Sequence, residues 1–200
     1  MSRSKSPLFR FILALLITAG LTALGPREQA LGDNVRIVYL HGAWVLTAEI
    51  VLGLSALAGL LGILFRRKNF QRWSAALGIT GLFFWVTSVP LSLWAMQANW
   101  NGLFLSEPRF RLAVIFSVTG VLLQLGLTLL ARPVYTSLFN VLFFAALRIA
   151  LSRAGAVLHP PPSPIFSSGI PSLQIFFIVV ILATMCAAWF MTRWWLQRQN

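Results

Sequence analysis

Six long stretches of mainly apolar residues divide this chain, and they constrain its fold more than any other feature. They cover residues 8–24, 35–65, 73–94, 112–130, 134–151 and 173–195. Each approaches or exceeds the roughly 20 residues that a helix needs to cross the hydrocarbon core of a bilayer. Because lipid offers no water to unpaired backbone groups, such segments must be helical. We therefore predict an all-α fold, a polytopic membrane protein built as a six-transmembrane-helix bundle.

The composition supports a membrane protein with one domain. Hydrophobic residues make up 58% of the chain and charged residues only 10%, whereas soluble domains carry roughly 25% charged residues. No change of composition marks a second domain, so residues 1–200 are treated as one. The net charge of +12 comes from clusters between the apolar stretches, a pattern that indicates topology and not nucleic-acid binding.

Cations at the ends of the apolar stretches predict the orientation. Ten Lys and Arg side chains fall on one side and six on the other, and the richer side is the cytoplasmic one by the positive-inside rule. Both termini are then cytoplasmic. For the first stretch a signal peptide is the alternative, but we favour a retained helix because Thr22 to Gly25 makes a poor cleavage site. Cys186, within the last stretch, is predicted to be a small buried packing residue.

The chain lacks the motifs of common enzymes. It has no P-loop, no Gly-x-Ser-x-Gly, no His-Glu-x-x-His and no paired cysteines, so we predict that it is not an enzyme. Glu49 is the one acidic residue inside an apolar stretch, and it should face the bundle, paired or protonated. It lies about two helical turns deeper than His41. Glu49 could therefore shape the floor of an outer cavity, although a structural hydrogen bond to a neighbouring helix is the favoured role.

The only two histidines, His41 and His159, fall at ends of apolar stretches that face the same outer side. Two neutral imidazoles on one rim are what an axially ligated haem iron needs. Each histidine also has a simpler interpretation. His41 could belong to an interfacial aromatic belt, and His159 could be an exposed loop residue beside a proline turn.

Aromatic and cationic residues on the same side could complete a haem site. Tyr39 and Trp44 could build an apolar slot, and the predicted loop from Trp94 to Arg109, with Trp100 and Phe104, could form a platform for a porphyrin face. An aromatic girdle is the alternative. Of the six outer arginines, Arg36 and Arg109 are the best candidates to hold two propionates. The six outer arginines could equally pair with acidic residues or lipid phosphates. They are Arg27, Arg36, Arg109, Arg111, Arg148 and Arg153.

Several segments together resemble one family. Arg36-Ile-Val-Tyr-Leu-His41 resembles the Tyr-x-His segment with which helix two begins in the haem exporter protein C (CcmC-type) family, a branch of the tryptophan-rich (WWD) haem-handling proteins of cytochrome c assembly. Leu158-His159 resembles its Leu-His-Gln segment. Trp100 to Arg109 aligns with its tryptophan-rich signature, with Glu107 in place of the signature's Asp. The resemblance in the layout of six helices covers nearly the whole chain. It implies a divergent member of this family.

The resemblance implies a function. It makes His41 and His159 the ligands of a non-covalent b-type haem, bound at the outer face and presented for cytochrome c maturation. It also implies a multi-pass protein of the cell inner (plasma) membrane, with an ABC-type haem-handling complex and a periplasmic haem chaperone as partners. The alternative is a non-catalytic structural or assembly subunit of a larger membrane complex that binds no haem. Small-residue pairs, Ser55 with Gly59 and Gly78 with Gly81, are predicted to let helices approach closely.

Overall fold

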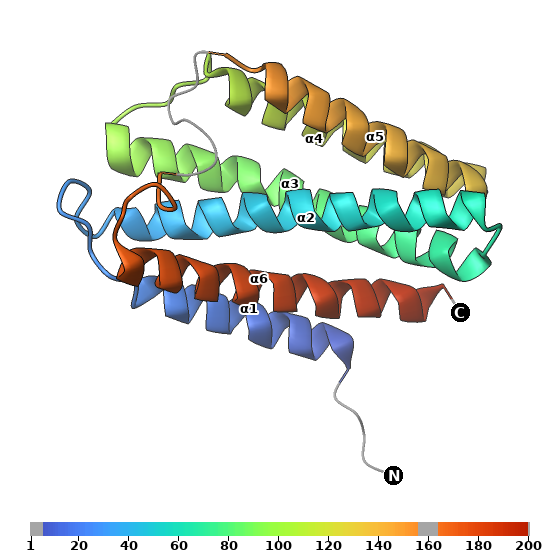
Figure 1. Ribbon diagram of the computed structural model, residues 1–200, viewed down its shortest axis with the longest axis horizontal. Helices are drawn as coiled ribbons and strands as arrows, with labels where there is room; N and C mark the ends of the chain where they lie inside the picture. The colour runs from blue at the N-terminus through green and yellow to red at the C-terminus, as the bar shows by residue number, and fades with distance from the viewer. Residues whose placement is uncertain (1–5, 156–163, 200) are drawn as a thin grey trace, which may run out of the picture.

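A computed structural model describes residues 6–155 and 164–199, and these residues form an all-α bundle (Figure 1). The described chain contains six helices: α1 Pro7–Ala23, α2 Val35–Leu64, α3 Lys68–Trp100, α4 Pro108–Leu130, α5 Pro133–Arg153 and α6 Pro171–Arg198. Five of them, α2 to α6, are long and apolar enough to cross a membrane, and α1 is a shorter apolar helix. The predicted all-α polytopic membrane fold is confirmed.

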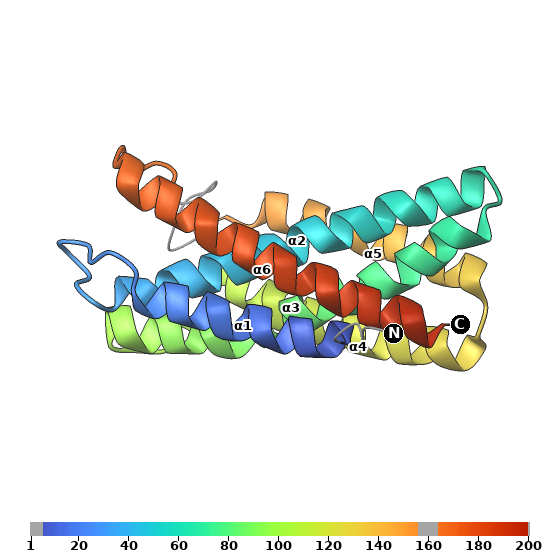
Figure 2. The same ribbon diagram turned by 90° about the horizontal axis from the view of Figure 1, so that it is seen from below.

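Successive helices alternate in direction, so the bundle has two distinct ends (Figures 1 and 2). We call one the terminal end; it holds the start of α1, the end of α6 and the turns 65–67 and 131–132. We call the other the distal end, where α1, α3 and α5 finish and α2, α4 and α6 begin. This topology places His41 and Arg109 at the same end because each lies close to the start of an even-numbered helix.

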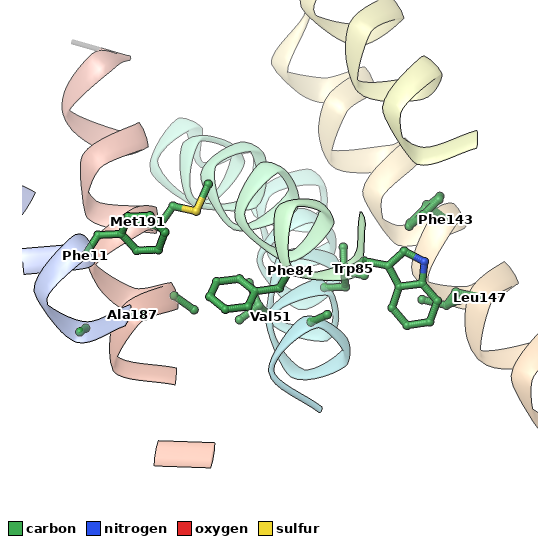
Figure 3. Packing of buried hydrophobic residues seen from close by; sticks show 12 residues of the cluster. Phe11, Val51, Phe84, Trp85, Phe143, Leu147, Ala187 and Met191 are labelled. Carbon is green, nitrogen blue, oxygen red and sulfur yellow. The ribbon is translucent and has the colours of Figure 1, made fainter. Parts of the chain in front are cut away.

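Helices α2 and α3 form a central hairpin, with α1 and α6 on one side and α4 and α5 on the other (Figure 1). The hydrophobic core is continuous through this hairpin. Phe84 lies beside Val51, and α1 and α6 cover that side with residues such as Met191, while Trp85 points to the opposite side, towards Phe143 of α5 (Figure 3). Adjacent residues of α3 therefore anchor both outer helix pairs.

Small residues set the closest helix contacts, as predicted. A methyl group on Gly59 of α2 would lie 2.7 Å from the carbonyl oxygen of Ser137 in α5. Ser55 donates a hydrogen bond of 2.7 Å to the carbonyl oxygen of Ser74 in α3. Gly81 lies directly against Leu52, again on α2. In a bundle without a hydrophobic driving force between helices, such close backbone packing and buried hydrogen bonds hold the elements together.

The prediction for α3 was too short at both ends. The helix begins at Lys68 and continues to Trp100, where Asn101 ends it in the left-handed conformation with φ of 51°. Pro90 lies inside it and does not stop it, as is common in membrane helices, where neighbouring groups satisfy the freed carbonyl. The predicted loop from Trp94 to Arg109 is consequently wrong: the connection covers only residues 101–107.

The prediction for Cys186 was also wrong, because its side chain is exposed on α6. In a soluble protein a small apolar residue inside a hydrophobic stretch is usually buried. The outer face of a membrane helix meets lipid, so apolar side chains there gain nothing by turning inward. Hydrophobicity alone therefore fails to separate core from surface in this chain.

Candidate functional site

A cavity of about 590 Å³ opens at the distal half of the bundle among α2, α3, α4 and α5. Its size lies within the range of small-molecule sites in proteins. Its walls combine apolar side chains with a few polar and charged ones. The lining residues on which the site depends are His41, Glu49, Trp85, Ser88, Ser92, Trp100, Glu107, Arg109 and Arg148.

Polar contacts at the distal end fix the helices that form this cavity. The side chain of Asn34, just before α2, donates a hydrogen bond of 2.7 Å to the carbonyl oxygen of Ala98 in α3. Glu107 caps α4, because one of its carboxylate oxygens accepts a 2.5 Å hydrogen bond from the backbone N–H of Phe110. Arg109 is the second residue of the capped helix, so this cap also positions its side chain in the cavity wall.

His41 contributes an imidazole to the cavity. Its Nδ1 lies 3.5 Å from the hydroxyl oxygen of Ser92 on α3, a contact at the outer limit of hydrogen bonding. Ser88 and Ser92, one turn apart on α3, line the same side. The histidine ring is therefore held against α3 in a wall that is otherwise largely apolar.

Glu49 and Arg148 form an ion pair that joins α2 to α5 across the cavity. The Glu49 side chain is mostly buried, with 23% of its surface exposed, whereas half of the Arg148 side chain is accessible. Both expected roles of Glu49 therefore occur together, since it bonds a neighbouring helix and lines the cavity. The ion pair thereby compensates the charge of Glu49, the one carboxylate within the apolar stretches.

Two further charged side chains of the cavity wall have buried atoms without hydrogen-bond partners. These atoms are Nε of Arg109 and Oε1 of Glu107, and the Glu107 side chain is more than nine-tenths buried. A buried polar group left unsatisfied costs about 1–3 kcal/mol. Such atoms call for an explanation, and a bound ligand that supplies polar groups would provide one.

The structure brings together three of the predicted site residues: His41, Arg109 and Trp100 all line the cavity. Phe104 does not line it; the residue is 40% exposed, and its ring meets that of Trp100 edge to face, with centroids 6.4 Å apart at 89°. These two rings therefore do not form a flat platform. His159 lies outside the described residues.

The other three predicted residues turn away from the cavity. Arg36 pairs with Asp33 at 3.0 Å and donates to the carbonyl oxygen of Gly25. Tyr39 is fully buried, and its hydroxyl donates a 3.2 Å hydrogen bond to the carbonyl oxygen of Pro26. Trp44 packs on Phe84, and its indole N–H donates to Thr87 at 2.7 Å. All three therefore stabilise the bundle and lie outside the cavity lining.

The cavity wall also contains Arg148, which was predicted only as one of six outer arginines, and three residues that were not predicted at all: Ser88, Ser92 and Trp85. A signal for the last three is present, because positions 85, 88, 92 and 96 repeat with the period of one helix face, and two of them are hydroxyl residues inside an apolar stretch. Arg148 and Glu49 are charged residues within two of the predicted apolar stretches, 134–151 and 35–65.

No family model matches this chain, and neither a curated protein nor a solved structure matches it significantly. The fold and the cavity therefore define the class by themselves: a polytopic membrane protein with a cavity lined by charged and aromatic residues in its distal half.

Proposed function

We propose that the distal cavity binds haem non-covalently, with His41 as an axial ligand, and that the chain presents this haem for cytochrome c maturation. One observation supports this best. An imidazole, a guanidinium with an unpartnered buried N–H and an exposed indole, from three different helices, line the same cavity. A haem needs a nitrogen ligand, cations for its propionates and apolar walls for its ring.

The residues present fit these requirements. Val38, Val45, Leu46 and Met96 supply apolar wall, and Trp85 and Trp100 supply aromatic surface. Arg109 would hold one propionate through the N–H that now lacks a partner. Arg148 would hold the other while sharing its charge with Glu49. The contact with Ser92 would orient the His41 ring, as outer contacts do for many metal-binding histidines.

When bound, haem would supply an iron centre, and the chain's own task would be to hold it and expose it. His159 is the proposed second ligand, on the resemblance to the haem exporter family. The same resemblance suggests an ABC-type complex and a periplasmic haem chaperone as partners. The greater number of cations at the terminal end supports a cytoplasmic location for that end, which would place the cavity at the outer face of a plasma membrane.

A visible absorption spectrum tests haem binding directly. The protein is purified in mild detergent, haem is supplied and unbound haem is removed. We expect a retained Soret band, and a His41→Ala variant should retain at least about tenfold less haem or show a spectrum of altered coordination. Absence of a retained band, or a spectrum unchanged in the His41→Ala, His159→Ala double variant, would contradict the ligand assignment.

The two neighbouring arginines of α4 provide a matched pair for the propionate assignment. Arg109 lines the cavity, whereas Arg111 does not and bonds the carbonyl oxygen of Leu105. Arg109→Gln should weaken haem binding by about tenfold to a hundredfold, since a charge-assisted hydrogen bond contributes about 1.5–3 kcal/mol. Arg111→Gln should leave haem affinity within about twofold. Equal losses of haem affinity in both variants would show that the loss of one positive charge, and not the loss of a propionate contact, causes the effect.

The alternative function is a structural or assembly subunit that binds no haem. It is favoured by the limited burial of α4 and α5, whose most apolar windows are only 17% and 22% buried within the bundle. A stable haem-free assembly with other subunits, found by mass measurement of the native complex, would support this alternative. A lone chain loaded with haem would exclude it.

A further inference from the structure

A second apolar groove lies at the terminal end, on the surface of the α2–α3 hairpin. Leu54, Leu57, Ala58 and Leu61 of α2 line one wall, and Asn69, Phe70 and Trp73 of α3 line the other. The α2 residues span about two helical turns, or roughly 10 Å along the axis. Leu54, Leu57 and Phe70 are exposed, so the groove opens outward, where a membrane helix meets acyl chains.

The groove ends at a tight turn made of consecutive cations. Arg66 adopts the left-handed conformation with φ of 51°, and the backbone N–H of Arg67 bonds the carbonyl oxygen of Gly62 at 3.2 Å. This closes α2 and lets α3 begin at Lys68. Gln71 reinforces the turn by donating to the same Gly62 carbonyl oxygen. Three exposed cations are thus fixed immediately before the Asn69 and Phe70 wall.

These cations lack anionic partners on the described chain. The chain has only four acidic residues, and every ion pair among the described residues belongs to Asp33 or Glu49, towards the distal end. No side-chain hydrogen bond or ion pair links Arg66, Arg67 or Lys68 to another described residue. The terminal end therefore offers uncompensated positive charge next to an apolar groove.

From this juxtaposition we infer that the terminal end binds an anionic phospholipid, with its phosphate at Arg66, Arg67 and Lys68 and an acyl chain in the groove along Leu57 and Trp73. The charges of the cations and the lipid phosphate are opposite in sign, and basic pockets between membrane helices are sites for acidic lipid headgroups. Each cation near the headgroup contributes roughly fivefold to binding. This site is separate from the distal cavity and does not depend on what that cavity binds.

Tryptophan fluorescence provides a direct test, because bromine atoms on an acyl chain quench an indole that they touch. The full chain is placed in phosphatidylcholine nanodiscs that contain either brominated phosphatidylglycerol or brominated phosphatidylcholine at the same low mole fraction. We expect phosphatidylglycerol to quench with an apparent affinity at least about fivefold higher. Trp73→Phe should remove most of this excess, because Trp73 is the tryptophan that lines the groove.

A charge variant and a matched control complete the test. Arg66→Gln, Arg67→Gln, Lys68→Gln should lower the phosphatidylglycerol preference to about onefold, and its exposed positions tolerate glutamine. Arg27→Gln, Arg111→Gln, Arg153→Gln removes the same charge from the distal end and should keep the preference. Equal quenching by the two lipids, excess quenching that survives Trp73→Phe, or equal losses in both triple variants would each overturn the inference.

Discussion

At the scale of single residues, charged side chains of the distal half form a small number of specific ion pairs. Arg148 is the only cation paired with Glu49 among the described residues, and Asp33 holds both Arg27 and Arg36. Removing one member of a partly buried pair leaves the other without compensation, which costs more than the pair itself contributes. The Glu49–Arg148 pair therefore allows a measurable test of this asymmetry.

The first prediction at this scale is a double-mutant cycle. Arg148→Met should lower the free energy of unfolding by about 1–3 kcal/mol, less than for a fully buried pair because half of the Arg148 side chain is accessible. Adding Glu49→Gln should recover part of this loss, since the unpaired carboxylate is then gone. Thermal unfolding in detergent measures all three variants. Losses that simply add would show that the two side chains do not interact.

The second prediction concerns the end of α4. Ala131 has a φ of 50°, a left-handed conformation that costs a residue with a Cβ about 1–2 kcal/mol. Ala131→Gly should therefore raise the melting temperature, with a gain of up to about 1 kcal/mol after the entropy of the unfolded chain is included. The control is Ala146→Gly, at an exposed position inside α5, which should lose about 1 kcal/mol. A loss at both positions would contradict the assigned conformation.

At the scale of helices, close contacts determine how the elements pack. A methyl group on Gly59 would collide with backbone, the carbonyl oxygen of Ser137 at 2.7 Å, and with the Ser74 hydroxyl at 2.9 Å. Asn140 of α5 extends this contact region, because its side-chain amide donates to the Ser74 carbonyl oxygen and accepts from Gln124 of α4. One small region of α3 thus connects α2, α5 and α4.

The prediction at this scale compares two glycines. Gly59→Ala should destabilise the bundle by about 1–3 kcal/mol, because α5 must move away from α2 and the buried contacts around Ser74 weaken. Gly126→Ala, in α4, meets nothing within 4 Å and should be neutral or stabilising by up to about 1 kcal/mol. Unfolding in detergent compares the two. A Gly59→Ala variant as stable as the unmodified protein would contradict the tight α2–α5 contact.

Sequence reasoning located the helices better than it located the site. Apolar stretches and the positive-inside rule predict six helices and place His41 and Arg109 at one end, as the structure has them. The sequence did not predict how each helix is rotated about its own axis. Tyr39 is two residues from His41, about 200° around α2, and it faces α6 instead. Uniformly apolar faces carry no pattern that would have revealed this.

At the scale of the whole molecule, the two ends differ in chemistry. The distal half holds all four acidic residues, the candidate haem cavity and arginines that are partly paired. At the terminal end several cations lie over aromatic rings, as with Arg198 over Trp194 at 4.1 Å and Arg193 over Trp189 at 5.7 Å. The haem and lipid experiments therefore probe opposite ends of one bundle, and a change at one should leave the other unaffected.

The three cations in the turn between α2 and α3 affect how the hairpin inserts into the membrane. Moving Arg66, Arg67 and Lys68 through the bilayer would desolvate three cations that form no ion pair with any described residue. Each such passage is opposed by at least about 2.5–3.5 kcal/mol. The orientation of the hairpin is therefore fixed once it has entered the membrane, and the four helices that pack around it (α1, α4, α5 and α6) are oriented by it.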